Sequence, residues 1–111
     1  MRKLLASLLF LALLGAGGAQ ALAATRSVAV GDNWFVRKGP PPTITVRKGT
    51  KVTWRWTGVD VHNVHAHKGP VHFRSGYKSS GTYSRTLKRR GTYVVYCDIH
   101  PPRMRMTIKV R

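Results

Sequence analysis

The chain has 111 residues, a single cysteine, and 20 Lys and Arg against three acidic residues, a formal net charge of +17 at pH 7. This length leaves room for one small domain and excludes a second. One cysteine excludes an intramolecular disulfide framework, and the positive charge favours association with anionic partners or surfaces.

The N-terminal segment, residues 1–23, has the pattern of a signal peptide. Arg2 and Lys3 precede an apolar run, and Ala21 and Ala23 match the small residues of a cleavage site. An uncleaved membrane anchor is the alternative, but the Ala- and Gly-rich second half is less apolar than a spanning helix requires. We expect one mature domain, residues 24–111, in the periplasm or outside the cell.

The charge is spread along the expected mature domain. Two of the 20 Lys and Arg residues lie in the signal peptide, and the other 18 face Asp32, Asp60 and Asp98, which gives a net charge of +15. Acidic partner proteins and a peripheral contact with anionic membranes fit this charge. Export and the lack of a recognisable nucleic-acid-binding motif argue against a specific nucleic acid.

In chain order, the mature part predicts short strands separated by turns and no helix. Alternating or apolar runs predict strands at residues 27–30, 43–46, 51–56, 59–66, 83–87, 92–97 and 104–110. The proline-rich residues 38–42 predict a stiff extended connection, and residues 67–80 the longest loop. This spacing is typical of an antiparallel β-sandwich.

The sequence YCDIHPPRM, residues 96–104, contains a cysteine, a histidine and a methionine within eight positions. Strand alternation points Cys97 inward at the end of one strand and Met104 inward at the start of the next, with His100 in the turn between them. An unpaired cysteine in an exported protein is buried, links two chains, or binds a metal as a thiolate. A thiolate, an imidazole and a thioether near one point favour metal binding.

These ligand types are typical of copper. A thiolate with imidazoles and a weak thioether stabilises both Cu(I) and Cu(II), and His62, on the inward side of an earlier strand, can supply the second imidazole. Asn63 could then tie that strand to the cysteine loop by a hydrogen bond. Zinc also accepts Cys and His but cannot transfer electrons.

At this point the chain resembles the small blue copper proteins, or cupredoxins, of the plastocyanin, pseudoazurin and amicyanin group. The shared motifs are His62-Asn63-Val64, Gly91-Thr92-Tyr93, Tyr96-Cys97, His100, and Met104 before a final alternating strand; an early hairpin at 44–54 and a middle loop at 73–76 also match.

The resemblance implies an all-β, Greek-key antiparallel sandwich of about seven to eight strands. It also implies a type 1 copper site in which His62, Cys97 and His100 form a trigonal set and Met104 is the long axial ligand. The spacing from cysteine to methionine is intermediate between the amicyanin-like and plastocyanin-like loops, which leaves Met106 as the rival axial ligand. His100 should lie at the surface within an apolar patch.

The expected function is therefore a small electron carrier that docks transiently on acidic redox partners, acts as a monomer and is not an enzyme. The alternatives are a copper module for storage, delivery or sensing, and a basic protein that binds anionic polymers or membranes. His65, His67 and His72 are interpreted as surface residues, with adventitious metal binding by the His65–His67 pair as the minor alternative.

Overall fold

Residues 24–111 are described by a computed structural model, in which they form eight β-strands. The strands are β1 (Thr25–Gly31), β2 (Trp34–Phe35), β3 (Thr43–Val46), β4 (Thr50–Trp56), β5 (His65–Lys68), β6 (Thr82–Leu87), β7 (Gly91–Tyr96) and β8 (Arg105–Val110). Within these residues there is no helix long and apolar enough to span a membrane. The predicted signal peptide, 1–23, lies outside the described residues.

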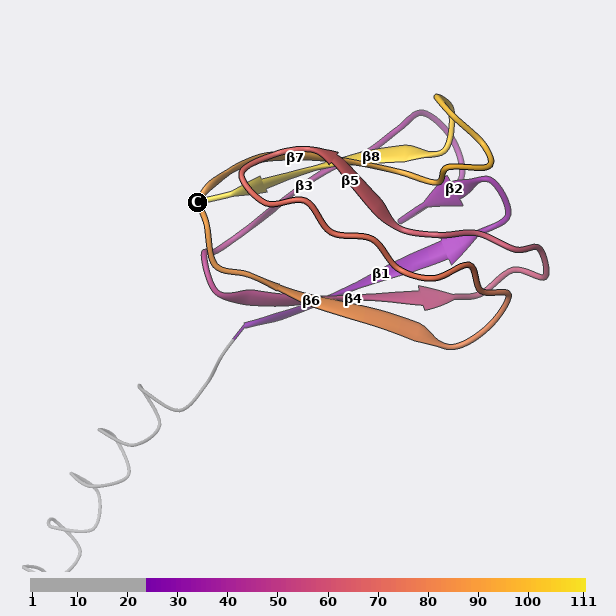
Figure 1. Cartoon of the computed structure of the whole chain (residues 1–111), viewed down its shortest axis with the longest axis horizontal. Helices are drawn as coiled ribbons and strands as arrows, with labels where there is room; N and C mark the ends of the chain where they lie inside the picture. Colours follow the sequence, from indigo (N-terminus) through magenta and orange to yellow (C-terminus); the bar gives the residue numbers. More distant parts are fainter. Residues whose placement is uncertain (1–23) are drawn as a thin grey trace, which may run out of the picture.

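The strands form two sheets that pack face to face (Figure 1). One sheet has the order β2-β1-β4-β6 and the other β3-β8-β7-β5. The predicted all-β sandwich is confirmed. Each sheet is mixed rather than wholly antiparallel, because β1 pairs with β4, and β3 with β8, in parallel.

The core follows the predicted alternation of side chains. In β4 every second residue is buried, including Val52 and Trp54, and in β8 the same holds for Met106 and Ile108. Burial of an apolar side chain of this size contributes roughly 1.5–3 kcal/mol to folding. Both sheets therefore direct one apolar face to a shared interior and leave the Lys- and Arg-bearing face in solvent.

One predicted strand differs from the structure, and one observed strand is not predicted. The segment 59–66 was expected to be one strand, but β5 begins only at His65, and His62 forms an isolated bridge with Lys78. The predicted inward side is nevertheless confirmed, since His62, Val64 and Ala66 have no exposed surface. The two-residue strand β2 was not predicted, because so short a run has no detectable alternation.

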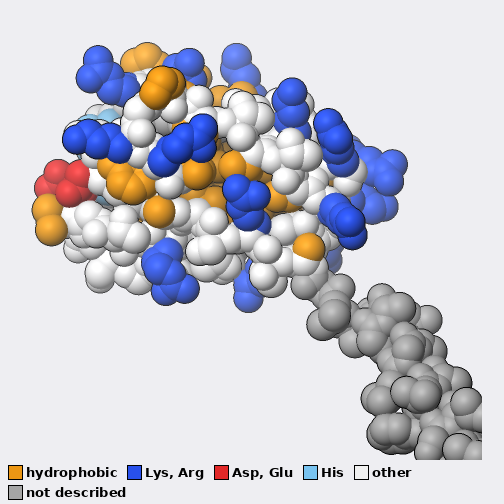
Figure 2. Space-filling view, turned by 180° about the vertical axis from the view of Figure 1, so that it is seen from behind, with side chains coloured by type: hydrophobic (Ala, Val, Ile, Leu, Met, Phe, Trp, Pro, Cys, Tyr) orange, Lys and Arg blue, Asp and Glu red, His pale blue; other side chains and the backbone are white. Residues whose placement is uncertain are grey.

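The loops that carry the predicted ligands meet at one end of the sandwich, opposite the C-terminus (Figure 1). One is the turn between β7 and β8, and the other is the segment between β4 and β5. Figure 2 shows the Lys and Arg side chains scattered over the visible face, while the visible acidic and His side chains gather at one end. On this face the positive charge is therefore distributed rather than concentrated in one patch.

Candidate metal centre

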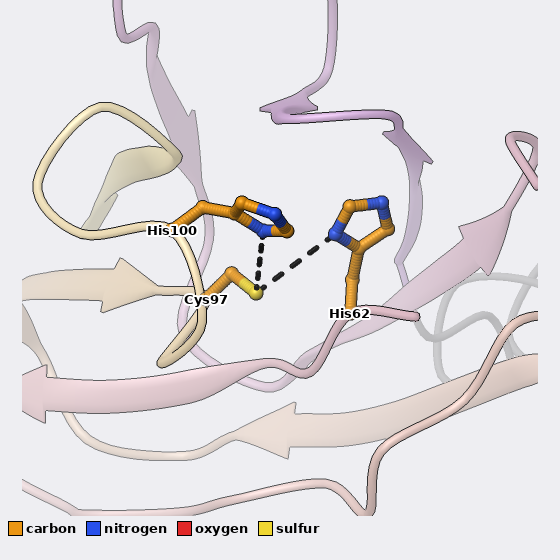
Figure 3. Close-up of side chains that lie close together, drawn as sticks. All are labelled: His62, Cys97 and His100. Atoms are coloured by element: carbon orange, nitrogen blue, oxygen red, sulfur yellow. Dashed lines mark hydrogen bonds between the residues drawn. The ribbon is translucent and has the colours of Figure 1, made fainter. Parts of the chain in front are cut away.

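Three predicted ligands converge on one point (Figure 3). Cys97 directly follows β7, His100 lies in the turn after it, and His62 lies in the segment before β5. Cys97 and His62 are fully buried, whereas His100 is half-buried. The site is therefore closed on its inner side and reaches the surface through one imidazole.

The donor atoms face one another. The Cys97 sulfur lies 3.6 Å from Nδ1 of His100 and 3.9 Å from Nδ1 of His62. A metal ion bonded to sulfur at about 2.3 Å and to nitrogen at about 2.0 Å, with tetrahedral to trigonal angles, separates these atoms by roughly 3.5–3.7 Å. The three side chains thus fit a single ion with little rearrangement, and their donor set is the one typical of copper.

The backbone of the turn places Met104 beside Cys97. The Cys97 N–H donates to the Met104 carbonyl at 3.0 Å, and the Met104 N–H donates to the His100 carbonyl at 3.0 Å. Met106 instead pairs with Val95, further along β7. Both methionine side chains are fully buried, so burial does not distinguish them, but Met104 is the one at the level of the cysteine.

Asp32 orients the buried imidazole. Nε2 of His62 lies 3.0 Å from Oδ1 of Asp32, and the same carboxylate accepts the backbone N–H groups of Val59 and Asp60. The hydrogen bond from His62 and the two backbone N–H groups lower the Asp32 pKa to about 2. An N–H on Nε2 leaves the Nδ1 lone pair directed at the sulfur, which is the tautomer a metal ligand needs.

Asn63 links the two loops, as the sequence predicts. Its Nδ2 donates to the Asp98 carboxylate at 2.8 Å, and its Oδ1 accepts the Asp98 backbone N–H at 2.8 Å. Burial alone would raise the pKa of Asp98, but the hydrogen bonds from Asn63 and two histidines lower it to about 2. These reciprocal bonds fix His62 and Cys97 relative to each other, since each is adjacent to a bonded residue.

The sequence did not predict Asp32 as part of this centre. It lies 30 positions before His62, and only the parallel pairing of β1 with β4 brings the residues that follow the two strands together. One signal was available. In a chain with three acidic residues, each acid is a candidate for a specific partner, and two of the three bond to residues of the site.

The sandwich and its end-loop Cys–His–His cluster define a cupredoxin. The sequence profile described as "Copper binding proteins, plastocyanin/azurin family" matches residues 25–111. The chain therefore belongs to the plastocyanin/azurin family of copper-binding proteins, and copper is its cofactor. A comparison with curated protein sequences gives no significant match.

Solved structures agree with this assignment. An oxidized methionine-to-leucine variant of amicyanin is 26% identical, with a TM-score of 0.65, and the match covers 78% of this chain and 81% of that one. A reduced tryptophan-to-tyrosine variant of amicyanin is 25% identical, with a TM-score of 0.66 and coverages of 84% and 88%.

A purple cupredoxin from Nitrosopumilus maritimus shares the fold at 17% identity, with a TM-score of 0.65, over 78% of this chain and 99% of that one.

Proposed function

We propose that the chain is an exported type 1 copper protein that carries electrons between partner proteins, with His62, Cys97 and His100 as the close ligands and Met104 as the axial ligand. The observation that carries this proposal is the convergence of two Nδ1 atoms on one buried sulfur. The position of Met104 beside Cys97 supports its choice over Met106.

The ligand set suits electron transfer better than catalysis. Copper held there would cycle between Cu(I) and Cu(II), because the soft sulfur donors favour Cu(I) and the imidazoles also accept Cu(II). Four protein ligands would leave no open position for a substrate, and three of them, Cys97, His62 and Met104, have no exposed surface. Asp32 and Asn63 hold the imidazole and the loop in place, which limits rearrangement between the two oxidation states.

The surface around the site suits transient docking. In the described part of the chain, four large apolar side chains are exposed, and three of them, Val59, Val61 and Ile99, lie in the two loops that carry the ligands. His100, the half-exposed ligand, lies in the same turn as Ile99. An apolar contact surface on a strongly basic domain fits an acidic redox partner that binds briefly.

Export and oligomeric state belong to the same proposal. The signal-peptide pattern and the fold family favour a periplasmic or extracytoplasmic monomer, and the charge allows a peripheral contact with anionic membranes.

The test is repeated redox cycling of the copper-loaded protein in the presence of a Cu(I) chelator. A carrier should be reduced by ascorbate and reoxidised by ferricyanide over several cycles, recovering its visible absorption each time without losing copper. The matched control is Met106→Leu, which replaces a buried methionine outside the proposed ligand set and in which reoxidation should restore the visible absorption as in the wild-type protein. Release of Cu(I) to the chelator on each reduction of the wild-type protein would instead favour the storage or delivery function.

A further inference from the structure

A second group of potential metal ligands lies on the outer side of the same loops. His65, His67 and Asp98 each offer one donor atom, and these three atoms lie within 4.8 Å of one another. His65 and His67 are less exposed than their interpretation as surface residues predicts, with 18% and 34% of their side chains accessible, and the Asp98 side chain is 20% exposed. His72, in contrast, is exposed as expected.

The two imidazoles point at one carboxylate. Oδ1 of Asp98 lies 2.9 Å from Nδ1 of His65 and 2.9 Å from Nε2 of His67. The two rings lie 4.0 Å apart between centroids, and the His67 ring lies 4.5 Å from that of Tyr96. The donors are therefore gathered before any ion binds, and neighbouring rings limit their freedom to turn away.

The fold explains why this cluster forms. Because side chains alternate along the chain, Cys97 faces the interior and Asp98 faces the outer side of the sheet. On β5, a register shift between Ala66 and Lys68 lies at His67, and such bulges re-aim side chains. Asn63 fixes the carboxylate by the hydrogen bond to its other oxygen.

We propose that His65, His67 and Asp98 form a second metal site, for a borderline divalent ion such as Zn²⁺, Ni²⁺ or Cu²⁺. Two imidazoles and one carboxylate are ligands that these ions accept, and three protein ligands leave a position for water. The partial exposure of His67 supplies the entry route. This second site is formed by residues that are not copper ligands in the proposed electron carrier.

Arg74 is the feature that opposes binding. Its Nε lies 3.9 Å from the Asp98 carboxylate, and its side chain is 61% exposed. A long contact with an exposed arginine contributes little to stability, so the Arg74 side chain can move into solvent when a divalent ion takes its place. Arg74→Ala should accordingly strengthen metal binding, whereas a purely hydrogen-bonded cluster would have no such response.

The test is calorimetric titration with Zn²⁺ of the protein loaded with one equivalent of copper and reduced to Cu(I), with His67→Gln as the disrupting variant and His72→Gln as the matched control. Wild type and His72→Gln should each bind one equivalent, and His67→Gln should bind at least about tenfold more weakly. Imidazole NMR resonances of His65 and His67, rather than His72, should shift. Equal Zn²⁺ affinity in wild type and His67→Gln, or no saturable binding, would overturn the proposal.

The same titration on Cys97→Ser separates this inference from the proposed function. If the second site is real, Zn²⁺ should shift the His65 and His67 resonances of this variant as in wild type, whether or not the inner site holds copper. If those resonances do not shift in either protein while the wild-type protein still binds copper, the proposal of a second site is wrong and the proposed electron-carrier function is unaffected.

Discussion

At the scale of single residues, the sequence predicted the side chains that meet at the candidate metal centre but only part of what holds them. Cys97, His100 and Met104 are predictable because strand alternation and one short turn fix their relation within eight positions. His62 is predictable from its inward parity, which holds although the expected strand there is mostly irregular. Asp32 is not, because its contact with His62 depends on pairing between distant strands.

The two methionines should respond differently to replacement by leucine. Met104→Leu should retain copper and change the reduction potential and visible spectrum, because an axial thioether tunes the site more than it holds the ion. Met106→Leu should leave both unchanged and cost less than about 1.5 kcal/mol of stability, as volume-conserving core replacements do. Voltammetry and absorption spectra of the two variants measure this, and exchanged outcomes would make Met106 the axial ligand.

Asp32→Ala should weaken copper binding by roughly 10–100-fold, the usual effect of removing the carboxylate behind a metal-binding imidazole. Asp60→Ala is the control, because it removes the same charge from an exposed neighbouring position whose carboxylate makes no hydrogen bond to the site. Competition with a chelator of known affinity measures both. Equal losses in the two variants would mean that charge, and not the orientation of His62, is responsible.

At the scale of elements, the strands were predicted well and the irregular segments were not. Residues 43–46 match β3 in full, the predicted runs at 51–56 and 83–87 begin one residue later than β4 and β6, and the run at 92–97 is shifted by one residue relative to β7. Alternation defines such strands because each has one buried face. It fails for 59–64, where side-chain hydrogen bonds to Asp32 and Asp98 take the place of a ladder.

Asn63→Ala should destabilise the domain because Asn63 joins those two segments. Its removal leaves the half-buried Asp98 N–H without its acceptor, and an unpaired group of this kind costs about 1–3 kcal/mol. Thr53→Ala, which removes an exposed hydroxyl pair with Ser84, should cost no more than about 0.5 kcal/mol. Chemical denaturation of the two variants compares them, and similar losses would show that the Asn63 bridge has no special role.

At the scale of the whole molecule, composition predicted the basic surface, and the spacing of the strands and the family resemblance predicted the fold class, but none of them predicted the sheet connections. Lys and Arg side chains are spread over the face seen in Figure 2, as expected, and two of the domain's three acids bond to residues of the candidate metal centre. The parallel pairs β1–β4 and β3–β8 could not be predicted, because alternation defines which face is buried and not which strand is the neighbour.

The net charge of +15 expected for the mature domain should give opposite salt effects on two rates. Electron transfer to an acidic partner should slow as ionic strength rises, because salt screens steering over about 8 Å at physiological strength. Electron self-exchange should become faster, because screening reduces repulsion between two copies. Stopped-flow kinetics and NMR line broadening across a salt series measure the two rates. Rates insensitive to salt with every partner, together with tight binding to anionic vesicles, would favour the membrane-binding alternative.

The most direct test of the type 1 copper site is the visible absorption spectrum of the Cu(II) protein beside that of Cys97→Ser. Because the sulfur lies within 4 Å of both imidazole nitrogens, wild type should show an intense thiolate-to-copper band that disappears on reduction. Cys97→Ser should remain folded by circular dichroism and lack the band. A band that persists in Cys97→Ser, or a copper-loaded wild-type protein without one, would contradict the assignment of Cys97 as a copper ligand.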